Sequence, residues 1–170
     1  MTVVLLLLLA GLQSGSPDPF VVQSDLQGIY DELSQAAMQF ATPADIDSFH
    51  NVFYAPDWVF VDAAGQRHSW TEMREHDVQA LSGPRADSIQ QPIRKLSLVP
   101  DGATVTTNVT TVRTIVDEEG RYGRKGATHT LTESTVFRDA WVKSGESWKL
   151  KSREQVGKPT VSVDHSPSLM

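Results

Sequence analysis

The pattern of the chain changes at residues 57–62, which read Asp57-Trp58-Val59-Phe60-Val61-Asp62. β-Branched and aromatic side chains follow one another here, and the run is bounded by Pro56 and by Ala63-Ala64-Gly65. Such a run is typical of a β-strand that ends in a turn. Before it, apolar residues recur with helical spacing; after it, strand-like segments dominate. The sequence therefore predicts a helical first part and a strand-rich second part.

Two amphipathic helices are predicted before this strand. From Ser24 to Phe40 the apolar side chains recur at steps of three and four residues. Thr42-Pro43 ends this helix, because the residue before a proline avoids helical backbone angles. Residues 44–54 form a second, shorter helix, which Pro56 ends.

A third helix and a series of long strands follow. Ser69 and Glu72 have the spacing of a capping box, which marks a helix start, and Ser82-Gly83-Pro84 ends that helix. Gly-containing turns then separate four strand-like segments, residues 88–100, 103–117, 127–142 and 147–156. Long twisted strands bury one face by wrapping around helices. We therefore expect an α+β fold in which a cone-shaped, curved antiparallel β-sheet wraps around three N-terminal helices, with a small-molecule pocket at its open end.

The two ends of the chain differ from this domain in composition. Residues 1–16 combine an apolar run too short to span a bilayer with small residues, the pattern of a signal peptide rather than of a buried strand or helix. We therefore expect a secreted or periplasmic protein with no membrane attachment after signal removal. Residues 17–23 are interpreted as a linker, 24–157 as the folded domain, and 158–170 as a flexible tail.

Composition disfavours several classes of function. The net charge is −6 and the 15 Lys and Arg residues are scattered, so nucleic acid is not an expected partner. The absence of Cys excludes disulfides, thiolate nucleophiles and Cys-ligated metals. The sequence also lacks a zinc-binding His spacing, a phosphate-binding Gly loop and a nucleophile elbow, and we expect neither a metal nor a cofactor.

Two stretches resemble the SnoaL-like branch of the nuclear transport factor 2-like superfamily. Residues 54–65 (YAPDWVFVDAAG) resemble its strand and Gly turn before the third helix, and residues 139–150 (DAWVKSGESWKL) resemble its closing hairpin. With the order of elements, the likeness covers residues 24–157. It implies the cone fold, in a superfamily that includes ketosteroid isomerase-like, cyclase-like and dehydratase-like enzymes as well as non-catalytic modules. These motifs are structural, so the resemblance assigns no catalytic residue.

Asp62 and His129 are candidates for proton transfer. Asp62 ends the first strand on the face of Trp58, where apolar surroundings would raise the pKa of a carboxyl group. Alternatively, its side chain bonds its own backbone in the turn that follows. His129 is a candidate because an imidazole can act as a general acid or base; it either lines the pocket or lies on the surface or at an interface.

Glu154 is the third catalytic candidate. It follows Leu150 and Ser152 at two-residue steps, which predicts that Glu154 faces the interior and that Arg153 faces outward. Arg113 is a ligand-binding candidate, because it can pair with Glu154 or with a substrate carboxylate. A structural ion pair at the rim is the alternative for both.

Three aromatic side chains are further candidates for ligand binding: Tyr30, Tyr54 and Trp58. They would supply an aromatic wall and a phenol donor, although such residues more often belong to the core.

Two functions stay open at this level. The first is an exported protein that binds a small apolar molecule and, if it is catalytic, acts by proton transfer as a cofactor-free isomerase, dehydratase or cyclase. The second is a non-catalytic ligand-binding or dimerisation module of the same fold. Apolar residues on both faces of the segment 127–142 favour a homodimer. The deciding feature is whether titratable groups converge inside a pocket.

Overall fold

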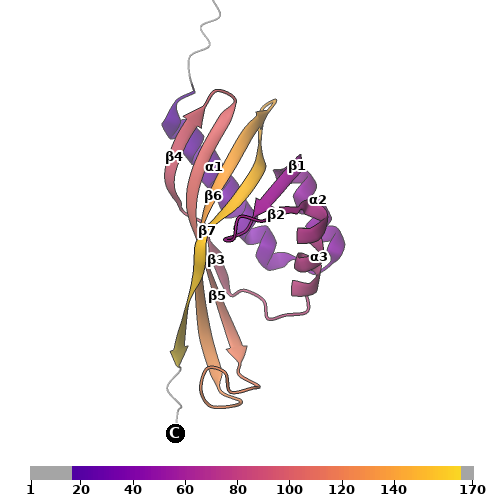
Figure 1. The fold of residues 1–170 in the computed structure, drawn as a ribbon, viewed down its shortest axis with the longest axis vertical. Coiled ribbons are helices and arrows are strands. Elements are labelled where there is room, and N and C mark those ends of the chain that lie inside the picture. The colour runs from indigo at the N-terminus through magenta and orange to yellow at the C-terminus, as the bar shows by residue number, and fades with distance from the viewer. Residues whose placement is uncertain (1–16, 166–170) are drawn as a thin grey trace, which may run out of the picture.

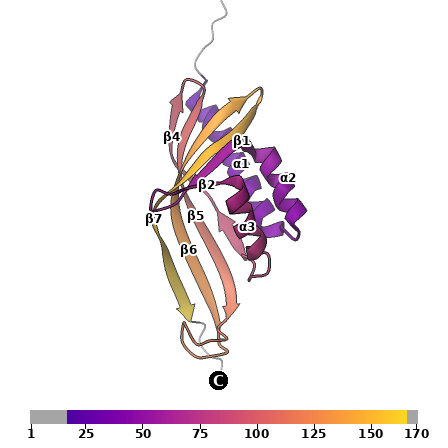
Figure 2. The same cartoon turned by 45° about the vertical axis from the view of Figure 1, so that its right-hand side comes forward.

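The computed structural model describes residues 17–165 (Figure 1). The predicted signal peptide, residues 1–16, lies outside the described residues, as does the end of the predicted tail, 166–170. The helices lie together on one face of a large curved sheet, as Figure 2 shows. In chain order the elements are α1 (Pro19–Gln39), α2 (Pro43–Phe53), β1 (Tyr54–Val61), β2 (Arg67–Ser69), α3 (Trp70–Ala80), β3 (Ser88–Gln90), β4 (Ile93–Val99), β5 (Gly102–Val116), β6 (Thr128–Ser144) and β7 (Ser147–His165).

The sheet is seven-stranded, with the order β2-β1-β7-β6-β5-β3 and with β4 also paired to β5. The α+β cone prediction is confirmed, with one correction. β1 runs parallel to β7 while the other pairings are antiparallel, so the sheet is mixed. The reason is that β1 adds to the edge of β7, far from it in sequence, rather than forming a hairpin with it.

Helix α1 begins earlier than the sequence predicts. The Asp18 side chain caps it by accepting the backbone N–H of Phe20 at 2.8 Å, and Pro19 occupies the first turn, where a proline fits without loss of a helical hydrogen bond. Val22 is only 4% exposed and continues the buried stripe of Leu26. Residues 19–23 of the predicted linker 17–23 are therefore part of the helix, and Val22 is part of the core.

Strand β7 continues beyond the predicted domain end. Residues 160–165 of the predicted flexible tail pair with β6, with Thr160 opposite Ser134 and Val163 opposite Leu131. A register shift next to Gly157, whose φ is +79°, takes up the extra residues. The distal halves of β5, β6 and β7 thus form an arm that extends past the helices (Figure 1).

Aromatic stacking holds α2 and α3 against β1. Tyr54 stacks on Trp58 with ring centroids 4.9 Å apart, and His50 of α2 stacks on Trp70 of α3 at 3.8 Å. Edge-to-face contacts between His50 and both Tyr54 and Trp58 join the two stacks. Such contacts add to the burial of apolar area, so the helices are fixed at the open end of the sheet.

The helix start can be tested with two adjacent valines. Val22→Ala removes a buried side chain and is expected to lower the free energy of unfolding by about 2 kcal/mol. Val21→Ala is the matched control, because Val21 is 53% exposed and its truncation should change stability by less than about 0.5 kcal/mol. Urea unfolding measures both. Equal effects would contradict the structured start of α1.

Candidate functional site

A bulge in β7 determines which charged side chain faces the helices. Leu150 lies opposite Trp141 and Ser152 lies opposite Ala140, so Lys151 is an extra residue in β7. One extra residue reverses the alternation of side chains beyond it. Arg153 therefore faces the helices and lines a cavity there.

The predicted inward orientation of Glu154 is consequently wrong. Its carboxylate accepts from Arg138 Nη1 at 3.1 Å, on the sheet face opposite the helices, beside Lys151. The sequence-based alternation did not account for the bulge.

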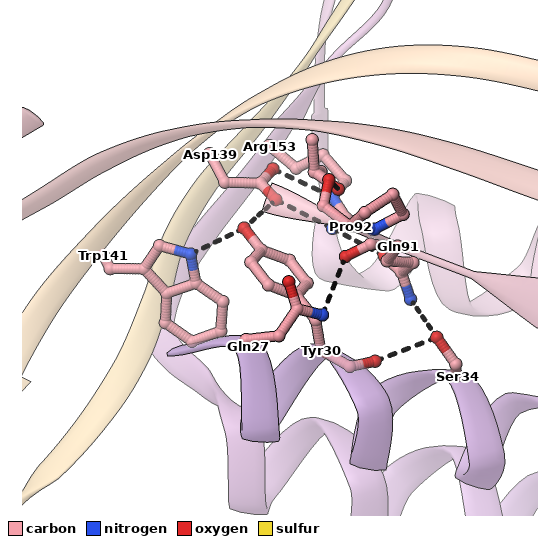
Figure 3. Close-up of polar contacts among 9 residues, drawn as sticks. Gln27, Tyr30, Ser34, Gln91, Pro92, Asp139, Trp141 and Arg153 are labelled. Atoms are coloured by element: carbon pink, nitrogen blue, oxygen red, sulfur yellow. Dashed lines mark hydrogen bonds and ion pairs between the residues drawn. The ribbon is translucent and has the colours of Figure 1, made fainter. Parts of the chain in front are cut away.

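A buried ion pair forms the centre of the helix-facing side (Figure 3). Arg153 donates two hydrogen bonds to Asp139, from Nε to Oδ1 at 2.9 Å and from Nη2 to Oδ2 at 2.8 Å. The Arg153 side chain is 16% exposed and that of Asp139 is 0% exposed. Burial alone would lower the pKa of Arg153, but the Asp139 carboxylate outweighs burial and holds this pKa above its ordinary value. The guanidinium is therefore a permanent cation.

Tyr30 belongs to this ion pair rather than to the cavity. Its hydroxyl donates to Asp139 Oδ2 at 2.6 Å and accepts from Trp141 Nε1 at 2.9 Å. Burial and the adjacent Asp139 charge raise the pKa of Tyr30, which stays neutral. The residue predicted to bind a ligand thus links α1 to β6.

Gln91 extends the network to the segment between β3 and β4. Its Oε1 accepts from Arg153 Nη2 at 3.2 Å, and its Nε2 donates to Ser34 Oγ on α1 at 3.0 Å. Arg153 thus uses Nε and Nη2 in these bonds, whereas Nη1 has no hydrogen-bond partner within residues 17–165. This leaves a fixed N–H donor for a ligand.

A cavity of about 290 Å³ opens beside this network. Its apolar wall includes Leu33, Met38, Phe40, Phe49, Leu81 and Ile89. Its polar side chains are Tyr54, Asp77, Arg85, Gln91, Arg113 and Arg153. Apolar walls with a few convergent polar groups are typical of small-molecule sites.

Asp77 is the cavity's carboxylate. It lies on α3, seven residues after Trp70 and four after Met73, on the face that packs toward the sheet. Burial raises the pKa of the Asp77 carboxyl, and the neighbouring His76 offsets only part of this. No other residue of the described chain forms a hydrogen bond or ion pair with this carboxylate. A half-buried, unpaired carboxylate with a raised pKa is suited to accept a proton.

Tyr54 supplies a neutral donor to the same cavity. Burial raises its pKa to about 12, so the phenol stays protonated at neutral pH. Its hydroxyl has no hydrogen-bond partner in the part of the chain that is described. Of the predicted ligand-binding residues, Tyr54 and Arg113 line the cavity, while Trp58 lies in the core behind the Tyr54 ring.

Asp62 lies outside the cavity and organises a turn. Its Oδ1 accepts the backbone N–H groups of Ala64 at 2.9 Å and Gln66 at 2.8 Å, and its Oδ2 lies 3.3 Å from His68 Nε2. These donors, led by Gln66, hold the pKa of Asp62 below its ordinary value. Of the two roles considered for Asp62, the structure therefore shows the one in the turn, where its side chain bonds the backbone.

His129 lies in the distal arm and does not line the cavity. Its ring is buried, with Nε2 3.8 Å from Oδ2 of buried Asp117. The side chain of Asp117 accepts the backbone N–H groups of Arg121 and Tyr122 and so shapes the loop that covers His129. The three predicted catalytic residues, Asp62, His129 and Glu154, are thus at three separate places.

Sequence reasoning missed two central residues of the cavity. Asp77 had a detectable signal, because an acidic residue on the apolar stripe of a helix is costly unless it has a role. Arg153 had no such signal, since the bulge at Lys151 leaves no pattern in the sequence.

Residues 17–165 show neither a metal-binding cluster nor a membrane-spanning helix. No group of three or more His, Asp or Glu side chains there is placed to hold a metal ion. Within the same range, no helix has the length and apolar character needed to cross a membrane.

Comparison with known proteins gives matches at the level of the fold. No family model and no curated protein matches the chain. Among solved structures, a candidate scytalone dehydratase from Novosphingobium aromaticivorans aligns with TM-score 0.56 at 14% identity, over 87% of this chain and 91% of that one. A candidate dehydratase from the NTF2-like family of Streptomyces avermitilis aligns with TM-score 0.55 at 14% identity, over 83% and 99%. A nuclear transport factor 2-like superfamily protein from Salmonella enterica aligns with TM-score 0.55 at 13% identity, over 82% and 93%.

Removing the charge of Asp139 tests the buried ion pair. Asp139→Asn leaves the Arg153 cation buried without a counter-charge and is expected to lower the free energy of unfolding by about 3–5 kcal/mol. Glu154→Gln breaks the half-exposed pair with Arg138 and should cost less than about 1 kcal/mol. Guanidinium unfolding followed by circular dichroism compares the two. Similar losses would argue against the pair as the structural centre.

The pH dependence of stability tests the environment of Asp77. Because its folded-state pKa lies above the unfolded value of 3.8, the folded chain binds more protons between those two values, and its stability falls as the pH rises through them. Asp77→Asn is therefore expected to raise the melting temperature at pH 7, and this gain should vanish below pH 3.8.

Asp62→Asn is the control of opposite sign. The lowered pKa of Asp62 stabilises the fold above the unfolded value, so this variant should melt lower at pH 7. A gain for Asp77→Asn that persists unchanged at low pH would show that charge is not its cause.

Proposed function

Because the chain has the nuclear transport factor 2-like fold, we propose that it is a cofactor-free enzyme that transfers a proton on a small, largely apolar carbonyl compound, in an isomerisation, dehydration or cyclisation. The observation that carries the proposal is the convergence of three groups on one cavity. Asp77, the Tyr54 hydroxyl and Arg153 Nη1 all belong to side chains that line it, and none has a hydrogen-bond partner within the described residues. Export is part of the proposal, on the signal-peptide pattern of residues 1–16.

Asp77 is the general base of this reaction. Its carboxylate removes a proton from the carbon next to the substrate carbonyl, and the electron pair of the broken C–H bond forms the C=C bond of an enolate. A raised pKa brings a carboxylate closer to the operating pH and makes it a stronger base. The apolar wall strengthens this effect, since it limits hydration of the charge.

Tyr54 and Arg153 stabilise the enolate oxygen. A neutral phenol and a fixed guanidinium N–H can both donate to the negative charge that develops there. Asp139 and Gln91 hold the guanidinium in place, so little reorganisation is needed when the charge forms. The protonated Asp77 then returns this proton in one of three ways: to another carbon of the enolate, to a β-hydroxyl that leaves as water, or to the alkoxide formed when the enolate attacks a second carbonyl.

The comparisons support the fold of the proposed enzyme, not its reaction or its substrate. Two of the matched proteins are described as candidate dehydratases, and those descriptions concern the matched proteins. At 14% identity the likeness carries the fold, so the reaction type rests on the cavity itself.

Hydrogen–deuterium exchange tests the proposed base. The probe is 2-tetralone, a neutral aromatic ketone with acidic α-protons, and proton NMR in D₂O follows its exchange. The wild-type chain should accelerate exchange above the buffer rate, and Asp77→Asn should reduce that acceleration by about 100-fold or more. Tyr54→Phe should reduce it by about 10-fold. Asp62→Asn, a carboxylate outside the cavity, should leave it unchanged.

Two outcomes would contradict the proposed proton transfer by Asp77. Equal exchange by the wild type and Asp77→Asn would remove Asp77 as the base. Binding of 2-tetralone by calorimetry without any accelerated exchange would favour the alternative, a non-catalytic ligand-binding module of the same fold.

A further inference from the structure

We propose that the ligand of this cavity carries an acidic group, a carboxylate in the simplest case, which Arg113 binds at the cavity mouth. This deepens the proposed function and rests on it for the cavity being the place where substrate binds. The expected ligand class is an apolar ring compound with a carbonyl at one end and an acid at the other.

The distribution of charge is the first observation. In a chain of net charge −6, three arginines line this single cavity. The charge of Arg153 is matched by Asp139, in two short hydrogen bonds. Arg85 is exposed and forms no ion pair with any residue in the described range. The cavity therefore offers more positive charge than its own acidic side chains neutralise, which favours an anionic ligand.

The weak ion pair between Arg113 and Glu133 is the second observation. The nearest acid is Glu133, with Arg113 Nη1 and Glu133 Oε2 3.7 Å apart, beyond hydrogen-bond distance. Both side chains are about two-fifths exposed, at 38% and 40%. Such pairs contribute little to stability and are easily exchanged. A ligand carboxylate that binds the guanidinium through two N–H groups makes the stronger contact and can displace Glu133.

The position of Arg113 is the third observation. It lies on β5 opposite Leu131 and lines both the inner cavity and an adjoining hollow of about 560 Å³ toward the distal arm. Asp77 lies in the inner cavity and repels an acid group there. The acid of a bound ligand is therefore directed outward to Arg113, which leaves its carbonyl end for Tyr54 and Arg153.

Calorimetry with two probes of matched shape tests this proposal: 2-naphthoate, which carries the acid, and 2-naphthamide, its neutral counterpart. The wild-type chain should bind 2-naphthoate more tightly. Arg113→Gln should weaken 2-naphthoate binding by about tenfold or more and leave 2-naphthamide binding unchanged. Glu133→Gln should strengthen 2-naphthoate binding, because it removes the competing acid. Arg138→Gln, on the opposite sheet face, is the matched control and should change neither affinity.

Three results would overturn the proposal: equal binding of the two probes, an equal effect of Arg113→Gln on both, or no binding of either. Melting curves of each variant confirm folding. The test is independent of proton transfer, because 2-naphthoate has no exchangeable α-proton. If Arg113→Gln has no effect while Asp77→Asn abolishes 2-tetralone exchange, only the acid-binding proposal fails. If the probes behave as expected without any exchange, only the catalytic proposal fails.

Discussion

The buried pair between Arg153 and Asp139 is the interaction on which both the fold and the cavity depend. Two charges taken out of water are costly unless every hydrogen-bonding group finds a partner. Here Tyr30 and Gln91 supply further bonds, from α1 and from the segment before β4, so one carboxylate connects the helix layer to two strands. The pair also places a cation at the cavity. Under the proposed function, Arg153 serves the structure through Nε and Nη2 and the chemistry through Nη1.

The charged side chains at the cavity differ in how well their charges are stabilised: Arg153 is paired with Asp139, and Asp77 is not paired within the described residues. The Asp139 carboxylate is held by Arg153 and Tyr30, whereas Asp77 is half-buried without a partner among the described residues and disfavours folding at neutral pH. A destabilised carboxylate next to a well-packed floor is a common compromise at functional sites, where activity is kept at the expense of stability. The aromatic stacks of α2, α3 and β1 offset this cost by fixing the helices that carry the cavity wall.

Much of the fold could be predicted from the sequence, because helix and strand periodicities differ and the turns carry Gly and Pro. The capping box at Ser69 and the long strands are where the pattern places them. The ends were harder to predict. The continuation of β7 to His165 depends on pairing with β6 rather than on local pattern. The start of α1 has a local signal, the Asp18 cap before Pro19, which the prediction from Ser24 onward missed.

The candidate site was predictable only in part. Tyr54 and Arg113 both line the cavity, and the face of Arg113 follows from alternation because β5 pairs with β6 in regular register. Alternation fails after Lys151, where a single unpaired residue exchanges Glu154 for Arg153. The Asp62 side chain accepts hydrogen bonds from the nearby backbone. The sequence allowed both this role and a place in the pocket, and it did not decide between the two.

The bulge at Lys151 has an evolutionary consequence. A descendant that lost this one residue would regain regular alternation, with Ser152 still opposite Ala140 and Arg153 still opposite Asp139. Arg153 would therefore keep its place toward the helices, and the charge of the cavity floor would not change. In this scaffold the bulge is thus a position at which the strand can lose a residue without a change in the ligand chemistry of the cavity.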